Sequence, residues 1–183
     1  MSKRIEELKE LIDRAGRDGD WKGPYDELLR ELYNCSVLFF ALSKNDFDPD
    51  TNTSVPLIST KDFGGLPALY VFSEVGYAGL WLNHYRHVSE DCRYGLIAAV
   101  EKGDHGFFSI LKIAKKLGAE MVMLDEGGPY IGIRLDDLLE ANGLDPSSIE
   151  LPLSGEEMLD MMNNKVSPEL RFARVPAIPL KGE

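Results

Sequence analysis

Residues Glu120–Gly143, EMVMLDEGGPYIGIRLDDLLEANG, decide the fold of this chain. Two short apolar runs, Glu120–Leu124 and Tyr130–Arg134, are joined by a Gly-Gly-Pro turn, which is typical of paired strands. Asp136–Asn142 then has the spacing of an amphipathic helix, and Gly143 stands where a left-handed residue ends a helix. The stretch therefore predicts a strand, a turn, a second strand and a helix.

The remainder of the chain mixes helical and strand-like patterns. Helical spacing occurs at 3–15, from Pro24 to Tyr33, at 74–86 and after Asp104, and strand-like runs occur at 35–43, 55–59, 67–73 and 94–100. This mixture predicts an α+β fold, a single domain with a mixed β-sheet of about six strands flanked by helices. We divide it into an N-terminal helix and loop (1–23), an α+β domain (24–143) and a C-terminal extension (144–183) with a short helix and a Pro-containing tail.

Length and composition indicate one globular domain. The chain has 183 residues, of which 44% are hydrophobic and 28% charged, and this is typical of a domain with one buried core. No apolar stretch approaches the roughly 20 residues of a membrane span, and the start MSKRIEELKE has no signal-peptide core. Together with two cysteines, Cys35 and Cys92, this predicts a cytoplasmic protein without a disulfide framework.

Charge argues against two classes of partner. The chain has 31 acidic and 20 basic residues, a net charge of −11, which disfavours nucleic acid and anionic membranes. The 119–160 segment contains eleven acids and only one base, Arg134. One interpretation is a solvated acidic surface. The other is a docking face for a basic partner, because clustered charge speeds the capture of opposite charge.

Two groups of residues contain side chains of the types that bind metal ions. Asp46, Asp48 and Asp50 have the alternate spacing that opens a calcium loop, but Thr51 and Leu57 stand where that loop needs Gly and Glu. We interpret this segment as a solvated loop. The second group, His84 and His87 with Asp91 and Cys92, contains zinc-ligand residue types without a second cluster at a recognisable spacing. We therefore predict no metal and keep this group as the centre of an alternative, enzymatic hypothesis.

The sequence gives little support to a catalytic nucleophile or to a phosphate-binding loop. A pair of Cys92 with His87 or His105 is a conceivable nucleophile and base, but neither cysteine lies in a known catalytic signature. Gly127-Gly128-Pro129 precedes a strand instead of opening a helix, so it lacks the helix N-terminus that holds an anion. We predict no catalytic residue and no cofactor.

Aromatic residues follow the third strand-like run. Tyr77, Trp81 and Tyr85 have helical spacing, and Trp and Tyr are the side chains that dominate binding hot spots. They are interpreted either as an exposed anchor for a protein or as part of the core beneath a sheet.

The middle of the chain resembles the N-terminal domain of the bacterial SseB family. The resemblance rests on VLFFALS, on GLPALYVFSE with the helix after it, and on LGAEMVMLDEGGPYIGIRLDDLL, and it covers Tyr25 to Gly143. Leu124, Asp125 and Glu126 stand where that family typically has an Asn-Pro turn, and only 144–183 follow in place of its larger C-terminal domain. The resemblance implies an α+β fold with a mixed sheet, and no established catalytic residues.

The favoured hypothesis is a non-catalytic cytoplasmic domain that binds a protein, such as an acidic immunity or secretion-accessory protein. The candidate partner-binding residues combine the acidic stretch with the aromatic helix: Asp125, Glu126, Asp136, Asp137, Glu140, Tyr77 and Trp81. The alternative is a small-ligand-binding or metal-dependent enzyme centred on the group His84, His87, Asp91 and Cys92. A structural homodimer is the third hypothesis.

Overall fold

The structure is a computed structural model that describes residues 2–44, 47, 54–59, 65–90, 94–101, 107–149 and 173–176. Its elements, in chain order, are α1 (Ser2–Asp18), α2 (Lys22–Asn34), β1 (Val37–Ala41), β2 (Ile58–Ser59), β3 (Ala68–Phe72), α3 (Val75–Tyr85), β4 (Tyr94–Glu101), α4 (Phe107–Lys116), β5 (Met121–Leu124), β6 (Ile131–Arg134), α5 (Leu135–Glu140), the 3-10 helix η1 (Pro146–Ser148) and β7 (Ala173–Pro176).

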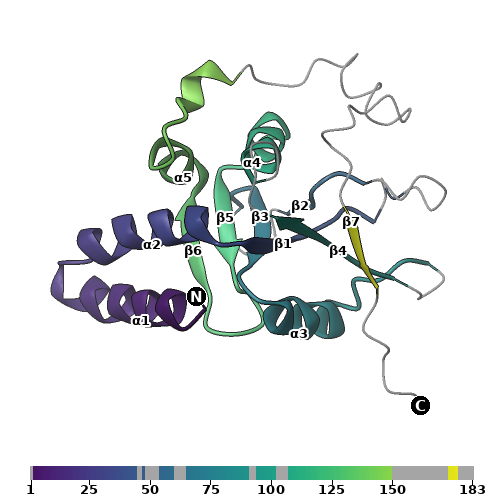
Figure 1. Cartoon of the computed structure of the whole chain (residues 1–183), viewed down its shortest axis with the longest axis horizontal. Helices are drawn as coiled ribbons and strands as arrows, with labels where there is room; N and C mark the ends of the chain where they lie inside the picture. The colour runs from purple at the N-terminus through teal and green to yellow at the C-terminus, as the bar shows by residue number, and fades with distance from the viewer. Residues whose placement is uncertain are drawn as a thin grey trace.

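One mixed sheet forms the centre of the molecule (Figure 1). Within the described residues its order is β6-β5-β3-β1-β4-β7, and β2 pairs with β3 off this path. The β3–β5 pair is parallel, and the other neighbouring strands are antiparallel. The predicted α+β fold with a mixed sheet flanked by helices is confirmed.

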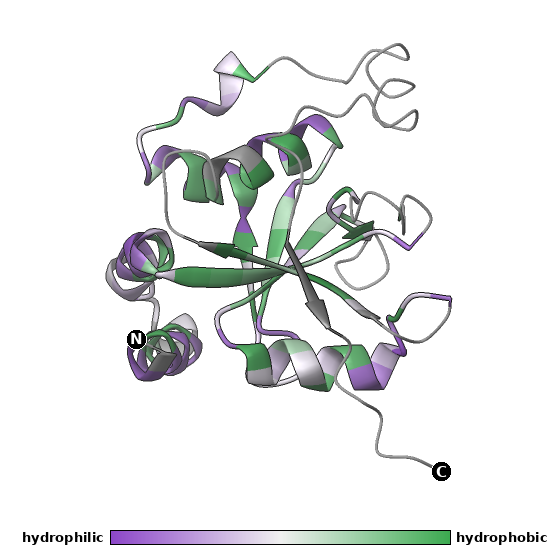
Figure 2. Cartoon of the chain, turned by 45° about the vertical axis from the view of Figure 1, so that its right-hand side comes forward, coloured by the Kyte–Doolittle hydropathy of each residue, from purple (hydrophilic) through white to green (hydrophobic). Residues whose placement is uncertain are grey.

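Helices lie on both sides of the sheet (Figure 2), and alternation along the strands divides the core into two layers. Leu38 and Phe40 of β1 face the layer formed with α1, α2, α4 and α5, whereas Ala41 faces the layer beneath α3. All five residues of β3 are buried, because helices cover both faces of the sheet there. The continuous apolar strands that the sequence predicted therefore lie between two helical layers.

The segment boundaries follow the sequence patterns with a few shifts. The N-terminal helix ends at Asp18, three residues later than predicted. The 55–59 run forms only the two-residue strand β2, and Pro56 makes an isolated bridge with Leu42. In the C-terminal extension, β7 pairs with β4, and the predicted short helix beyond η1 lies outside the described residues.

Candidate functional site

The parallel pair β3–β5 places the residues after each strand side by side. Val71 of β3 is in register with Leu124 of β5, so Ser73 and Asp125 meet at the carboxyl ends of the two strands. Helix α3 begins after Ser73, and the β5–β6 turn begins at Asp125. Four of the seven candidate residues, Tyr77, Trp81, Asp125 and Glu126, therefore gather at this edge of the sheet.

Asp125 lies at the centre of a buried polar network. Its carboxylate is 2.7 Å from the Nζ of Lys9 and accepts hydrogen bonds from the backbone N–H and the hydroxyl of Ser73, at 2.6 and 2.8 Å. Its backbone is left-handed, with φ of 61°, a conformation that Asp tolerates better than most residues. Because its exposed fraction is 0%, Asp125 does not belong to a partner-binding surface, and the sequence-based assignment is corrected here.

Tyr77 packs over this network. The Nζ of Lys9 lies 5.0 Å from the centre of the Tyr77 ring, a cation–π distance, and the Tyr77 hydroxyl donates a hydrogen bond to Glu6. That hydrogen bond, and then burial, raise the pKa of Tyr77. Gly128 packs against the same ring, so Tyr77 joins α1, α3 and the β5–β6 turn.

Glu126 attaches the turn to the far half of α3. Its carboxylate accepts hydrogen bonds from Trp81 Nε1 at 2.9 Å and from the Tyr85 hydroxyl at 2.5 Å. Trp81 is only 3% exposed and packs on Tyr70 and Phe72. Of the two interpretations of the aromatic helix, Trp81 therefore follows the core interpretation, whereas Tyr85 is exposed.

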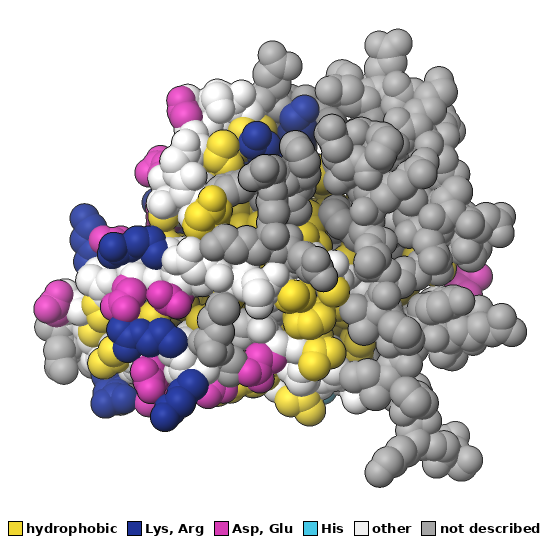
Figure 3. Space-filling view, in the orientation of Figure 1, with side chains coloured by type: hydrophobic (Ala, Val, Ile, Leu, Met, Phe, Trp, Pro, Cys, Tyr) yellow, Lys and Arg dark blue, Asp and Glu magenta, His cyan; other side chains and the backbone are white. Residues whose placement is uncertain are grey.

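Helix α3 differs from the neighbouring helices in its outer face. Its sequence, VGYAGLWLNHY, contains no charged residue, although α1 alone contains ten in 17 residues. Val75, Leu80 and Tyr85 are nevertheless 51%, 56% and 46% exposed. Figure 3 shows hydrophobic side chains gathered over α3, while charged side chains of both signs cover α1 and α2. Five-residue spacing makes these side chains project in different directions from the start, the middle and the end of the helix, and we call Val75, Leu80 and Tyr85 together the α3 surface.

Three carboxylates flank the α3 surface on the side of α1 and the β5–β6 turn. Glu6 and Glu126 accept hydrogen bonds from aromatic residues of α3, and Glu74 immediately precedes the helix. Glu74 acts on the pKa of Tyr77 through its charge, which places it at the same end. This flank is therefore negative, and Lys9 beside it is buried in its pair with Asp125, whereas the exposed cation Arg86 lies at the other end of α3, directly after Tyr85.

The other three candidate residues lie elsewhere, on α5. Asp136 pairs with Lys115 at 2.5 Å, Asp137 accepts a hydrogen bond from the Tyr25 hydroxyl at 3.0 Å, and Glu140 is exposed. Lys22 and Arg30 of α2 line the same groove as Asp137 and Glu140. Bases from α2 and α4 therefore lie next to the acidic residues of α5. The acids at 150, 156, 157 and 160 lie outside the described residues.

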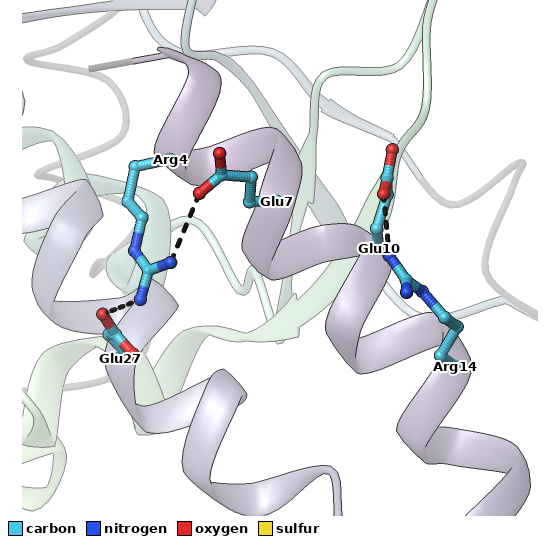
Figure 4. Close-up of polar contacts among 5 residues, drawn as sticks. All are labelled: Arg4, Glu7, Glu10, Arg14 and Glu27. Atoms are coloured by element: carbon cyan, nitrogen blue, oxygen red, sulfur yellow. Dashed lines mark hydrogen bonds and ion pairs between the residues drawn. The ribbon is translucent and has the colours of Figure 1, made fainter.

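Charges of both signs also alternate on α1 and α2 (Figure 4). Arg4 pairs with Glu7 of its own helix and with Glu27 of α2, and Arg14 pairs with Glu10. All of these side chains are exposed, and exposed pairs stabilise a protein only weakly. This surface is mixed in charge and offers no single-sign field to a partner.

His84 and His87, which belong to the alternative, enzymatic hypothesis, lie in different surroundings. His87 is half-buried, with Nε2 2.6 Å from the carbonyl oxygen of Leu42 and its ring edge-on to Trp81. Burial lowers the pKa of His87. His84 is exposed on α3 and contacts Tyr85. Asp91 and Cys92, like Asp46, Asp48 and Asp50, lie outside the described residues, and within the described part no group of three or more His, Cys, Asp or Glu side chains could hold a metal ion.

Comparison with protein-family models, with curated proteins and with solved structures found no match to this chain. Among the helices that the structure describes, none combines the length and apolar character required to cross a membrane.

Proposed function

We propose that this protein is a non-catalytic binding domain that binds a basic protein partner through the α3 surface. The observation that carries the proposal is the uncharged helix α3, with Leu80 at its centre 56% exposed. A helix without charged residues normally has all its faces covered, and exposed apolar patches rimmed by polar groups mark protein interfaces. A partner that covers Leu80 would remove this apolar area from water.

The carboxylates beside the α3 surface support a basic partner. An interface typically has an apolar centre and a polar rim, and here Glu6, Glu74 and Glu126 supply a negative rim on one side. Complementary charge at a rim raises the association rate and disfavours acidic partners. Asp125 and Trp81 act from beneath the surface, because they hold the β5–β6 turn and Glu126 in place.

Affinity capture from the source cells with matched variants tests this proposal. The variant Leu80→Asp introduces a charge at the centre of the α3 surface, and Leu11→Asp does the same at another exposed leucine, on α1. We expect the wild type and Leu11→Asp to capture the same basic protein, and Leu80→Asp to lose it. Capture that is equal for both variants, or a captured partner that is acidic, would contradict the proposal.

Cytoplasmic location and an immunity or secretion-accessory role are further parts of this proposal. The role is supported by the SseB-like pattern of 25–143, and the location by the presence of only two cysteines, Cys35 and Cys92, which fits a reducing compartment. Cell fractionation tests the location, and recovery of the protein outside the cytoplasmic fraction would exclude it. Co-expression with the captured partner tests the role, which requires that this chain relieve the partner's toxicity or raise its export.

A further inference from the structure

A groove of about 630 Å³ lies between α2 and α5, away from the α3 surface. This volume falls within the range of about 300–1,000 Å³ that is usual for small-ligand sites. Apolar atoms of Leu29 and Ala141 line it together with the aromatic residues Trp21 and Tyr25. The phenol of Tyr25 donates to Asp137 and accepts from the backbone N–H of Arg134 at the edge strand β6, so this part of the lining is fixed.

Charged side chains of both signs line the groove, and several of them have hydrogen-bond donors or acceptors that no other side chain uses. Within the described residues, Lys22, Asp26 and Glu140 make no side-chain hydrogen bond or ion pair, and Arg30 donates only from Nε, to the carbonyl oxygen of Asp26 at 3.1 Å. The two terminal nitrogens of Arg30 therefore have free donors in the planar arrangement that binds carboxylates.

The spacing of these charges limits the size of a ligand. Asp26 and Arg30 are four positions apart on α2, so their Cα atoms are about 6 Å apart along the helix axis. An extended dipeptide spans at most about 7 Å between its ends, so its two charged ends can reach side chains on successive turns of α2. Glu140 adds a second carboxylate from the α5 wall.

Trp21 supplies an apolar face beside these charges. Its side chain is 46% exposed and packs edge-on against Tyr25, with ring centroids 5.4 Å apart. An exposed indole next to carboxylates is suited to an organic cation and its apolar body. Trp81, the only other tryptophan in the sequence, is 3% exposed, so the two differ in their access to solvent.

We propose that the α2–α5 groove binds a small zwitterion of the dipeptide class. Arg30 binds the carboxylate of the ligand, Asp26 and Glu140 bind its ammonium group, and Trp21 covers its apolar side chains. No covalent step is involved. This site is separate from the α3 surface and does not depend on partner binding there.

The probe is leucyl-leucine, which absorbs no light at tryptophan wavelengths. Ligands of this size bind with dissociation constants of about 0.1–1 mM at ordinary ligand efficiency. We expect a saturable change in tryptophan emission and protection of Trp21 from collisional quenching. N-acetyl-leucyl-leucine and leucyl-leucine amide each lack one of the two charges and should bind about fivefold more weakly, the factor expected for one exposed charge contact.

Three variants assign the binding to the groove. Arg30→Met and Glu140→Gln should each weaken leucyl-leucine binding by up to about fivefold, whereas Arg14→Met, at an exposed pair on α1, should leave it unchanged. Calorimetry with Trp21→Phe provides a readout that does not need the indole signal, and binding there should also weaken. Absence of saturation, equal binding of the capped dipeptides, or equal affinities of Arg30→Met and Arg14→Met would overturn the proposal. Leu80→Asp should leave dipeptide binding intact, so failure of this site and failure of the α3 surface are distinguishable.

Discussion

The ammonium group of Lys9 lies 2.7 Å from the carboxylate of Asp125, although the two residues are 116 positions apart and both are buried. This ion pair attaches α1 to the turn after β5. Because Asp125 also binds Ser73, the end of β3 belongs to the same unit. The position of Glu126, and with it one flank of the α3 surface, therefore depends on a buried network.

Removing one charge of this pair should destabilise the protein strongly. In Asp125→Asn the left-handed backbone is still tolerated, but Lys9 is left buried without an opposite charge. We expect the free energy of unfolding to fall by about 3–5 kcal/mol, measured by urea denaturation.

The exposed pair of Arg14 with Glu10 provides the control for this prediction. Glu10→Gln should cost no more than about 1 kcal/mol. The double variant Lys9→Met/Asp125→Asn contains neither buried charge and should be more stable than Asp125→Asn alone, because the uncompensated ammonium group is gone. A loss in Asp125→Asn as small as that in Glu10→Gln would show that Lys9 reaches water in the folded protein.

A methyl group at Gly128 should disturb the contact of the turn with α3. An added Cβ would lie 2.6 Å from Cδ1 of Tyr77 and closer still to Cε1, so the ring or the turn must move. We expect Gly128→Ala to lower the free energy of unfolding by about 1–3 kcal/mol, measured by thermal denaturation. Gly76→Ala is the matched control: its Cβ would meet no atom within 4 Å, and it should raise stability by up to about 1 kcal/mol.

The Gly-Gly-Pro turn and its flanking strands were predictable from sequence because their signals are local. Alternation, apolar runs and turn residues report on neighbouring positions. The partner of Lys9 was not predictable in this way. The sequence does place Lys9 four positions after Ile5, on the apolar stripe of α1. That position indicates a buried cation, but it does not show which carboxylate pairs with it.

The acidic run of 119–160 shows a second limit of linear patterns. A charge count along the sequence cannot include the bases that other elements bring into the same region. Lys115 of α4 pairs with Asp136, and Arg30 of α2 lines the same groove as Asp137 and Glu140. The α3 surface was partly predictable, because the absence of charge in its sequence is local, but only the structure distinguishes exposed Leu80 from buried Trp81.

His87 should make stability depend on pH in mildly acidic solution. Burial lowers the pKa of His87 below its ordinary value of 6.5, so the unfolded chain binds this proton more readily than the folded protein does. The free energy of unfolding should therefore fall as pH decreases from 6.5 towards the lowered pKa, and His87 should contribute no slope above that window. Urea denaturation across this range should show a smaller slope for His87→Gln than for the wild type. If His84→Gln reduces the slope equally, the effect does not come from His87.

Two leucines on α3 separate folding from binding on a single helix. Leu82 is 4% exposed and belongs to the core beneath α3, whereas Leu80 is 56% exposed. Leu82→Ala should lower the free energy of unfolding by about 2–5 kcal/mol, because it leaves a cavity. Leu80→Ala should change it by no more than about 0.5 kcal/mol, yet weaken binding of the captured partner, because only the complex buries this side chain. Urea denaturation and titration of the partner measure the two effects. A large loss of stability in Leu80→Ala would mean that this side chain is covered within the folded chain itself, and α3 would then have no free apolar face to offer.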